Sequence, residues 1–284
     1  MSLGPCEIFE VGPRDGLQNE KREIPVAEKV ALVDKLSAAG FRRIECASFV
    51  SPKWVPQMAG SGEVLAGISR AEGVRYAALT PNMRGYEDAV AARADEVAIF
   101  ASASEGFSQK NINASIEEAF ARFAPILEEA RHVDMPVRGY VSCVVECPYD
   151  GKVDPGAVAR VADRLFAMGC YEISLGDTIG TGTPDSIARM LLSVRDVVPA
   201  GRLAGHYHDT HGRAMANIDA SLSMGLRVFD AAVGGLGGCP YAPGAAGNVA
   251  TEAVNKHLTA LGYDTGVDQA VVEEAAEMAR AMRG

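Results

Sequence analysis

Eight short β-rich runs alternate with helical stretches along the chain, and this alternation constrains the fold more than any other feature of the sequence. The intervals between these runs have helical periodicity. Because neighbouring parallel strands need helical crossovers, this alternation indicates a parallel sheet. Eight such units favour a closed (β/α)8 TIM barrel of the α/β class over an open sheet. The predicted strands are Cys6–Val11, Arg43–Ala47, Val74–Leu79, Glu96–Ala101, Val137–Val145, Glu172–Leu175, Leu203–His208 and Val228–Val233, and the clearest helices are Pro25–Ala39, Ser115–Arg131, Pro155–Met168, Pro184–Val198 and Arg213–Met224.

The length of the chain fits one barrel. It has 284 residues, and a barrel of this kind usually needs about 250. Two further helical patterns follow the eighth strand, at Val249–Leu261 and Asp268–Met282. We therefore predict a single catalytic domain over residues 1–284, in which residues 249–284 form a helical extension packed beside the barrel.

The charge of the chain argues against two classes of protein. The net charge of −10 is unlike that of nucleic-acid or membrane-surface binders, which carry a basic face. We see no apolar run of about 18 residues, the length that a membrane span needs, and no signal-peptide pattern at the N-terminus. Thinly spread cysteines then indicate reduced thiols in a cytoplasmic protein. They are Cys6, Cys46, Cys143, Cys147, Cys170 and Cys239.

Polar side chains collect near the carboxyl ends of the predicted strands, where barrels of this type carry their catalytic groups. His206 and His208 are two residues apart on a strand, so both imidazoles face the same side. Asp15, on the neighbouring first strand of a closed barrel, can add a carboxylate, and Asn248 an amide oxygen. Such a mixed nitrogen and oxygen set suits Mg²⁺ or Mn²⁺, with zinc as the alternative. Further polar residues at these ends are Arg14, Glu45, Ser48, Asp177, Thr178, Asp209 and Cys239.

Each of these features has a simpler interpretation when it is taken alone. A histidine pair in a strand is often structural, and a single aspartate after a strand usually forms a turn. Glu45 and Asp177 could be structural partners of nearby arginines. The Gly-rich segment around Cys239 is a poor dinucleotide motif, because Pro240 follows where a third glycine and a helix start are needed. The joint placement of all these groups at one rim favours a catalytic site.

Five segments of the sequence together resemble one known family. They are VGPRDGLQNE at 11–20, FVSPKWVPQM at 49–58, KNIN at 110–113, SLGDTIG at 174–180 and GGLGGCPYA at 234–242. These segments resemble the 3-hydroxy-3-methylglutaryl-CoA lyases, metal-dependent barrels of a superfamily that also contains Claisen-type synthases. The resemblance covers almost the whole chain, and the Gly-rich segment with Cys239 is its most specific part.

The resemblance implies a site and a partner. It implies a divalent cation held by Asp15, His206, His208 and Asn248, and catalytic roles for Arg14, Glu45, Asp177 and Cys239. It also implies an acyl-CoA substrate, with Lys21 at the acyl-CoA site, and a homodimer.

The expected reaction is a retro-Claisen cleavage of 3-hydroxy-3-methylglutaryl-CoA to acetyl-CoA and acetoacetate. We expect Asp177 to take the proton of the C3 hydroxyl, with Glu45 as the competing candidate. Arg14 would stabilise the thioester enolate and Cys239 would protonate it. The alternatives are a lyase for a longer C3 alkyl group or for citramalyl-CoA, a Claisen-type synthase, and a non-catalytic acyl-CoA or metal-binding protein.

Overall fold

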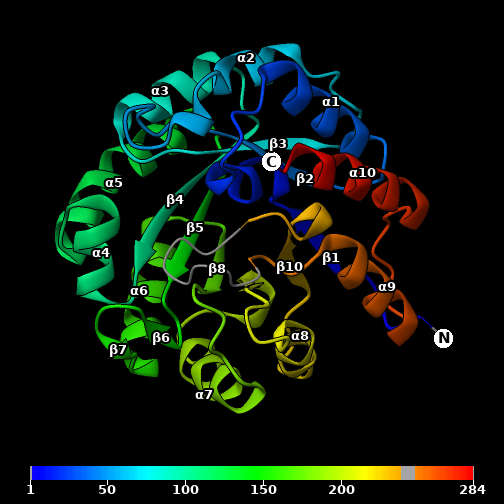
Figure 1. Cartoon of the computed structure of the whole chain (residues 1–284). Helices are drawn as coiled ribbons and strands as arrows, with labels where there is room; N and C mark the ends of the chain where they lie inside the picture. Colours follow the sequence, from blue (N-terminus) through cyan, green and yellow to red (C-terminus); the bar gives the residue numbers. More distant parts are fainter. Residues whose placement is uncertain (1, 238–246, 284) are drawn as a thin grey trace.

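The structure, a computed structural model, describes residues 2–237 and 247–283. Its centre is a closed parallel barrel with the strand order β1-β10-β9-β8-β5-β4-β3-β2 (Figure 1). The predicted barrel of eight strands is therefore confirmed. The strands are β1 (Glu7–Glu10), β2 (Arg43–Ser48), β3 (Arg75–Leu79), β4 (Glu96–Ser102), β5 (Val137–Ser142), β8 (Glu172–Asp177), β9 (Leu203–Tyr207) and β10 (Val228–Ala231).

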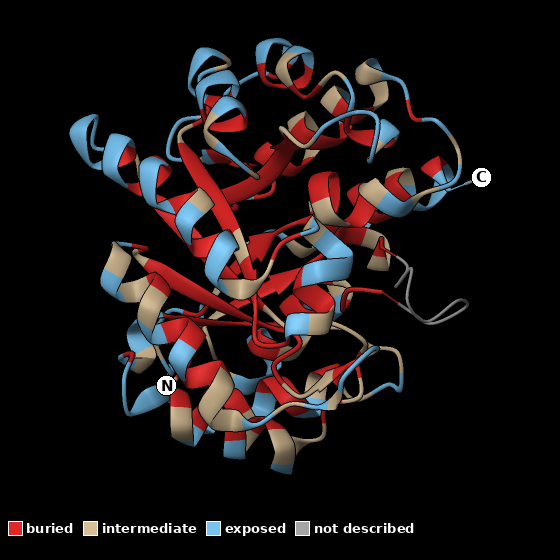
Figure 2. Cartoon of the chain, turned by 90° about the vertical axis from the view of Figure 1, so that its left-hand side faces the viewer, coloured by how far each residue is buried: buried red, intermediate tan, exposed pale blue. Residues whose placement is uncertain are grey.

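Helices surround the barrel and present their polar faces to solvent, while the strands at the centre are buried (Figure 2). The apolar core lies between the two layers, since the amphipathic helices turn their apolar sides to the outer face of the strands. The helices are α1 (Val26–Ser37), α2 (Ser61–Gly67), α3 (Met83–Ala91), α4 (Glu105–Ile112), α5 (Ile116–His132), α6 (Pro155–Met168), α7 (Pro184–Arg195), α8 (Ala214–Ser223), α9 (Thr251–Leu261) and α10 (Gln269–Met282).

Local sequence signals set several helix ends. Ser115 and Glu118 form a capping box at the start of α5. Gly169 ends α6 with φ 114°, a left-handed conformation that a glycine adopts without strain.

The fifth strand is shorter than its sequence suggests. β5 ends at Ser142, although the β-rich run continues to Val145. Cys143 has φ 60°, which turns the chain out of the strand direction. The chain then forms a small antiparallel pair, β6 (Glu146–Cys147) and β7 (Gly151–Lys152), before α6.

The last two helices complete the outer layer. α9 packs on β1, and α10 lies between α9 and α1 (Figure 1). Within residues 2–237 and 247–283, no helix is both long and apolar enough to cross a bilayer.

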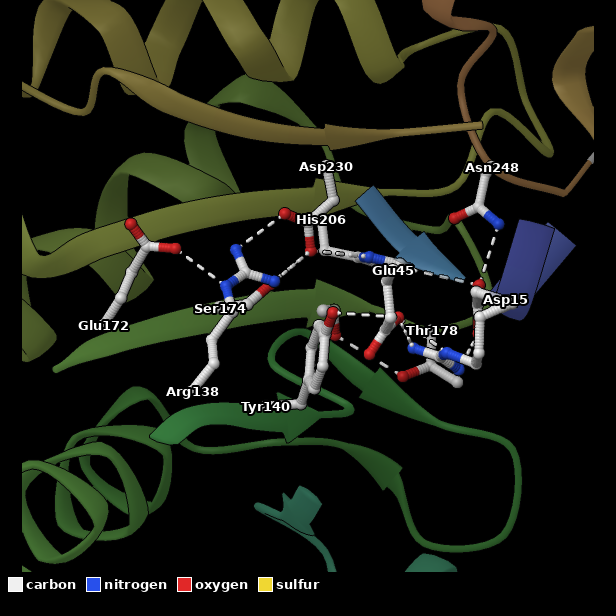
Figure 3. Close-up of polar contacts among 12 residues, drawn as sticks. Asp15, Glu45, Arg138, Tyr140, Glu172, Ser174, Thr178, His206, Asp230 and Asn248 are labelled. Carbon is white, nitrogen blue, oxygen red and sulfur yellow. Dashed lines mark hydrogen bonds and ion pairs between the residues drawn. The ribbon is translucent and has the colours of Figure 1, made fainter. Parts of the chain in front are cut away.

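The inside of the barrel is charged. Barrels of this fold usually fill their centre with branched apolar side chains. Here four buried charged residues from four strands pair with one another instead. Figure 3 shows three of them, Arg138, Glu172 and Asp230. We call these residues the barrel floor: Arg43, Arg138, Glu172 and Asp230.

Candidate active site

Three metal-binding side chains meet at the carboxyl ends of the strands. Asp15 lies in the helical turn Gly12–Gly16 after β1, and His206 and His208 lie at the end of β9. One ligand atom from each of the three lies within 4.8 Å of the others. The sequence prediction that His206, His208 and Asp15 converge is therefore confirmed by the geometry. We call the region around them the mouth: Arg14, Asp15, His206, His208 and Asn248.

The chemistry of these three residues fits a divalent cation. His206 Nε2 is 3.9 Å from Asp15 Oδ2, and a cation about 2.1 Å from two ligand atoms keeps them about 3–4 Å apart. His208 Nδ1 is buried and has no hydrogen-bond partner in the described part of the chain. A buried acceptor of this kind is usually satisfied, so an ion at this point would supply the missing interaction.

The two histidines have opposite electrostatic environments. Burial and the neighbouring His206 lower the pKa of His208 to about 4, which favours the neutral imidazole. Burial also lowers the pKa of His206, but its hydrogen bond to Asp230 and the charge of Asp230 outweigh this and raise the pKa. The described site thus contains one neutral ring and one ring held by a carboxylate.

Arg14 connects the mouth to the inside of the barrel. Its Nε donates to Glu45 Oε2 at 2.6 Å, and its Nη1 donates to Asp15 Oδ1 at 2.6 Å. Burial raises the pKa of Glu45, although the Arg14 guanidinium opposes this shift. Burial alone would raise the pKa of Asp15, but the charge of Arg14, together with His206 and the hydrogen bond from Asn248, lowers it overall. Arg14 therefore holds two carboxylates and keeps Asp15 ionised as a ligand.

Asn248 lies where the sequence prediction places it, beside Asp15. Its Nδ2 donates to Asp15 Oδ2 at 2.8 Å, and a backbone bridge joins it to His208. The amide nitrogen of Asn248 therefore faces Asp15, and ligation by its amide oxygen requires the amide group to turn over. Gln18 also donates to Asp15, from Nε2 to Oδ1 at 3.1 Å.

The turn that carries Asp15 is anchored by Glu10, the last residue of β1. Glu10 Oε1 accepts hydrogen bonds from the backbone N–H groups of Gly12 and Val233, at 2.8 and 2.9 Å. Its Oε2 accepts from the Thr251 hydroxyl at 2.6 Å. A Cβ on Gly12 would lie 2.5 Å from Glu10 Oε1, so a side chain there would break this contact. Glu10 thereby links the turn after β1 to Val233 and Thr251, which follow the last barrel strand.

Asp177 does not reach the mouth, contrary to our expectation. Asp177 pairs with Tyr207 across β8 and β9, and the Tyr207 hydroxyl contacts Ser221 of α8. Successive strand residues point to opposite faces of a sheet. Gly176 pairs with His206 and faces the inside of the barrel, so Asp177, the next residue, faces the helices. Its Oδ2 accepts the Gly182 N–H at 2.8 Å. Burial raises its pKa to about 6, but the carboxylate is placed to hold the loop before α7.

A large cavity opens at the mouth. It has a volume of about 1050 Å³, and its lining includes Arg14, Asp15, His206, His208 and Asn248. Basic and amide side chains of the KNIN segment also line it, together with Arg122. Lys21, expected at the acyl-CoA site, is exposed and does not belong to this lining. The basic groups at the cavity are Arg14, Lys110 and Arg122.

Cys239 lies outside the described residues. Two described residues on either side of it in the sequence, Gly237 and Asn248, line the cavity. The other cysteines, Cys6, Cys46, Cys143, Cys147 and Cys170, are buried free thiols, as predicted.

Comparison with known proteins identifies the family of this site. The family model described as HMGL-like matches residues 6–279. The chain belongs to the HMGL-like family. It is 59% identical over 277 residues to the 3-hydroxy-3-isohexenylglutaryl-CoA/hydroxymethylglutaryl-CoA lyase of Pseudomonas aeruginosa, covering 98% of this chain and 92% of that protein. It is 57% identical to the cytoplasmic 3-hydroxy-3-methylglutaryl-CoA lyase of Mus musculus, covering 95% and 79%.

Solved structures agree with this assignment. The HMG-CoA lyase of Brucella melitensis superimposes with a TM-score of 0.98 at 59% identity, over 99% of each chain. The carboxyl transferase domain of Rhizobium etli pyruvate carboxylase, at 16% identity and a TM-score of 0.74, shares the fold alone. With relatives named as lyases along nearly its whole length, this HMGL-like chain is a carbon–carbon lyase.

Two residues of this lyase site were not predicted from the sequence. Tyr140 lines the cavity, and its hydroxyl donates to Glu45 Oε2 at 3.2 Å. Asp230 contacts His206 from below, from Asp230 Oδ2 to Nδ1 at 3.1 Å. Both side chains point into the barrel from the middle of a strand, not from its end (Figure 3). The alternation of β5, in which Arg138 and Tyr140 are two apart, was the signal that could have found Tyr140.

Proposed function

We propose that the protein cleaves 3-hydroxy-3-methylglutaryl-CoA to acetyl-CoA and acetoacetate with the help of a divalent cation, Mg²⁺ or Mn²⁺. The convergence of Asp15, His206 and His208 beside Arg14 in one cavity carries this proposal. The names of the relatives supply the substrate.

Asp15, His206, His208 and Asn248 would hold the cation. A bound divalent ion makes a coordinated hydroxyl more acidic and fixes its orientation. Carboxylate and amide oxygens suit Mg²⁺ and Mn²⁺, and the imidazoles suit Mn²⁺ in particular. The role of the protein residues is to present these donors on three different segments of the chain around one point.

Glu45 is the better candidate for the proton acceptor. Its carboxylate lies inside the barrel, in contact with Arg14 and Tyr140, and its Oε1 has no partner in the described part of the chain. Tyr140 lines the cavity and touches Glu45, so its hydroxyl can pass a proton from the substrate hydroxyl to the carboxylate. Asp177 faces the helices and holds a loop, which supports a positioning role.

Arg14 is placed to stabilise the enolate of the thioester. Cleavage of the C2–C3 bond leaves a negative charge on the thioester oxygen, and a buried guanidinium beside it lowers the energy of that charge. Arg14 contacts Glu45 through Nε and Nη2, and it contacts Asp15 through Nη1. These contacts fix the group in advance, so it needs no reorganisation during the reaction.

Cys239 would return a proton to the enolate carbon. A thiol with an ordinary pKa of about 8.5 is mostly protonated at neutral pH and can act as an acid. We expect Cys239→Ala to lower turnover by about 10²–10⁴-fold while metal affinity stays unchanged. Near-normal cleavage by this variant would show that another group donates the proton.

A second substrate is favoured by the wall of the cavity. Leu79, Phe100 and Tyr140 pack together as an apolar cluster and line the cavity beside His206. An apolar wall at this place suits a C3 substituent longer than methyl, and one relative is named for an isohexenyl substrate. We therefore propose the isohexenyl compound as an alternative substrate.

Cleavage assays test both proposals. The purified protein is supplied with Mg²⁺, Mn²⁺ or a chelator, and acetyl-CoA and the keto acid are identified as products. We expect cleavage of the methyl compound that the chelator abolishes and either ion restores. Activity on the isohexenyl compound that falls in Leu79→Trp, while the methyl compound is still cleaved, would support the second substrate. Condensation of acetyl-CoA with a 2-oxo acid instead would identify a synthase.

We also propose that the protein is a cytoplasmic homodimer. Its relatives include enzymes named as cytoplasmic and others named as mitochondrial. Light scattering on the eluted protein and fractionation of the source cells test the two statements separately.

A further inference from the structure

Asp230 lies directly beneath the mouth and contacts one of the proposed metal ligands. It is the third residue of β10, it is buried, and its side chain points into the barrel. Asp230 Oδ2 is 3.1 Å from His206 Nδ1, on the side of the ring opposite the mouth (Figure 3). Asp230 is therefore not a ligand itself, but it touches the ring that supplies one.

Two further residues hold the carboxylate of Asp230 in place. Arg138 binds it with both ends of its guanidinium, from Nη2 to Oδ1 at 2.7 Å and from Nη1 to Oδ2 at 3.0 Å. Ser174 donates its hydroxyl to Oδ2 at 2.8 Å. A planar, two-point contact of this kind fixes both the position and the plane of a carboxylate. Oδ2, the oxygen that meets His206, is therefore the more constrained of the two.

Arg138 is itself fixed from the opposite side. Its Nε donates to Glu172 Oε1 at 2.7 Å, and Glu172 accepts from Arg43 Nη1 at 3.0 Å. All four members of the barrel floor are buried. Charges thus alternate from Arg43 through Glu172 and Arg138 to Asp230, and the last of them faces the imidazole.

This arrangement leaves one choice for the His206 ring. A carboxylate paired with a guanidinium can only accept hydrogen bonds, so the hydrogen must lie on His206 Nδ1. The neutral ring then has its free lone pair on Nε2, the atom that is 3.9 Å from Asp15 Oδ2. Carboxylates that act on the far nitrogen of a metal-binding histidine orient the ring and strengthen it as a ligand.

We propose that Asp230, held by Arg138 and Ser174, is a positioning residue that fixes the tautomer and the orientation of His206 so that Nε2 faces the cation. The inference rests on the cation of the proposed function, but not on the identity of the substrate. His208 differs from His206, since its Nδ1 has no partner in the described residues. The supported ring is therefore His206, and the loss of Asp230 acts on that ligand.

Metal affinity without substrate is the main test. Binding of Mn²⁺ is measured by equilibrium dialysis for the wild type, Asp230→Asn and Ser174→Ala. In Asp230→Asn the amide nitrogen must face either Arg138 or His206, both of which need an acceptor, so we expect affinity to fall about 10- to 100-fold. Ser174→Ala keeps the ion pair and removes one hydrogen bond, and we expect a loss of about fivefold.

Glu96→Gln is the matched control. Glu96 is a buried carboxylate inside the same barrel, and it accepts from the Tyr171 hydroxyl and makes no hydrogen bond to Arg138 or Asp230. The same exchange of carboxylate for amide there should leave Mn²⁺ affinity within about twofold of the wild type. An equal loss in Glu96→Gln would show a general weakening of the barrel and would overturn the proposal.

The tautomer itself gives a second measurement in metal-free protein. At a pH high enough for a neutral ring, the ¹⁵N chemical shifts of His206 should show a protonated Nδ1 and an unprotonated Nε2 in the wild type, and a mixture of tautomers in Asp230→Asn. If Asp230→Asn does not fold, Ser174→Ala and the wild-type shifts decide the question. Wild-type affinity in Ser174→Ala together with an Nε2–H tautomer in the wild type contradicts the proposal. Absence of Mn²⁺ binding in the wild type would instead contradict the proposed metal site.

Discussion

The floor and the mouth of the barrel both contain buried charges, but they treat them differently. In the floor, Arg138 satisfies Asp230 and Glu172, and Glu172 is shared with Arg43. In the mouth, His208 Nδ1 is buried without a partner in the described chain, and so is Oε1 of Glu45, which contacts Arg14 of the mouth from inside the barrel. Complete pairing makes the floor a support, whereas the open acceptors above it are available for an ion and a substrate. The floor residues therefore stabilise the barrel, whereas the groups at the mouth are available for the reaction.

The largest effect is expected from His206→Ala in the mouth. We expect Mn²⁺ affinity to fall by at least about 100-fold and turnover by at least about 10⁴-fold, because a ligand is lost. The unfolding free energy of the metal-free protein should change by less than about 2 kcal/mol, since Asp230 keeps its bonds to Arg138 and Ser174. Dialysis, steady-state kinetics and urea unfolding measure the three quantities. Metal content equal to that of the wild type would remove His206 from the ligand set.

Arg138→Met should lower stability in addition to metal affinity, because Arg138 holds Asp230 beneath His206. It leaves the carboxylate of Asp230 buried without its guanidinium, whereas Glu172 keeps its pair with Arg43. Breaking a buried pair in this way costs about 3–5 kcal/mol of unfolding free energy. Urea unfolding measures this cost. Arg164→Met is the control, because Arg164 pairs with Glu117 on the surface, where ion pairs contribute little. Equal unfolding curves for the two variants would abolish the distinction between floor and mouth.

Glu45→Gln separates the two candidates for the proton acceptor. We expect the chemical step to slow by about 10²–10⁴-fold while Mn²⁺ affinity is kept, because Glu45 contacts Arg14 and Tyr140 and not the cation ligands. Single-turnover kinetics measure the step. Asp177→Asn is the comparison and should slow it much less. The opposite ranking of the two variants would restore Asp177 as the base.

Glu10 gives the smallest effect, and it depends on pH. Burial raises the pKa of Glu10 to about 7, whereas an unfolded glutamate has a pKa of about 4.3. The folded protein keeps this proton where the unfolded chain has lost it, so the contribution of Glu10 is complete below about pH 4 and is lost as the pH rises to about 7. We expect the unfolding free energy to decrease by about 2–3 kcal/mol over this range from this group alone. Urea unfolding of Glu10→Gln should show no such decrease, and an unchanged pH dependence would contradict the assignment.

The fold was predictable because alternating strands and helices leave a strong signal. All eight barrel strands lie where the sequence places them, and the capping box at Ser115 marks the start of α5. The end of β5 was predicted three residues too late, since the run to Val145 remains β-rich although Cys143 turns the chain. The valine-rich composition of this run indicates a strand, but it does not reveal that one residue within it, Cys143, has a positive φ.

The site was predictable where the spacing along one strand determines the face. His206 and His208 follow from this rule, and Arg14 and Asp15 follow from their place after β1. Asp177 was placed wrongly because the end of a strand was considered without the parity that turns its side chain outward. Asp230 was not found, since its function depends on contacts with Arg138 and His206, which are far away in the sequence.

The charged interior has a consequence for heat. The cost of removing charged groups from water falls as the temperature rises, whereas the stabilisation per unit of buried apolar area reaches a plateau. The pairs of Arg43, Arg138, Glu172 and Asp230 therefore become relatively more favourable on warming, while the apolar layer between strands and helices gains nothing further. Thermal inactivation of this enzyme should accordingly begin with loosening of the outer helices, at temperatures where the centre of the barrel still keeps its strands together.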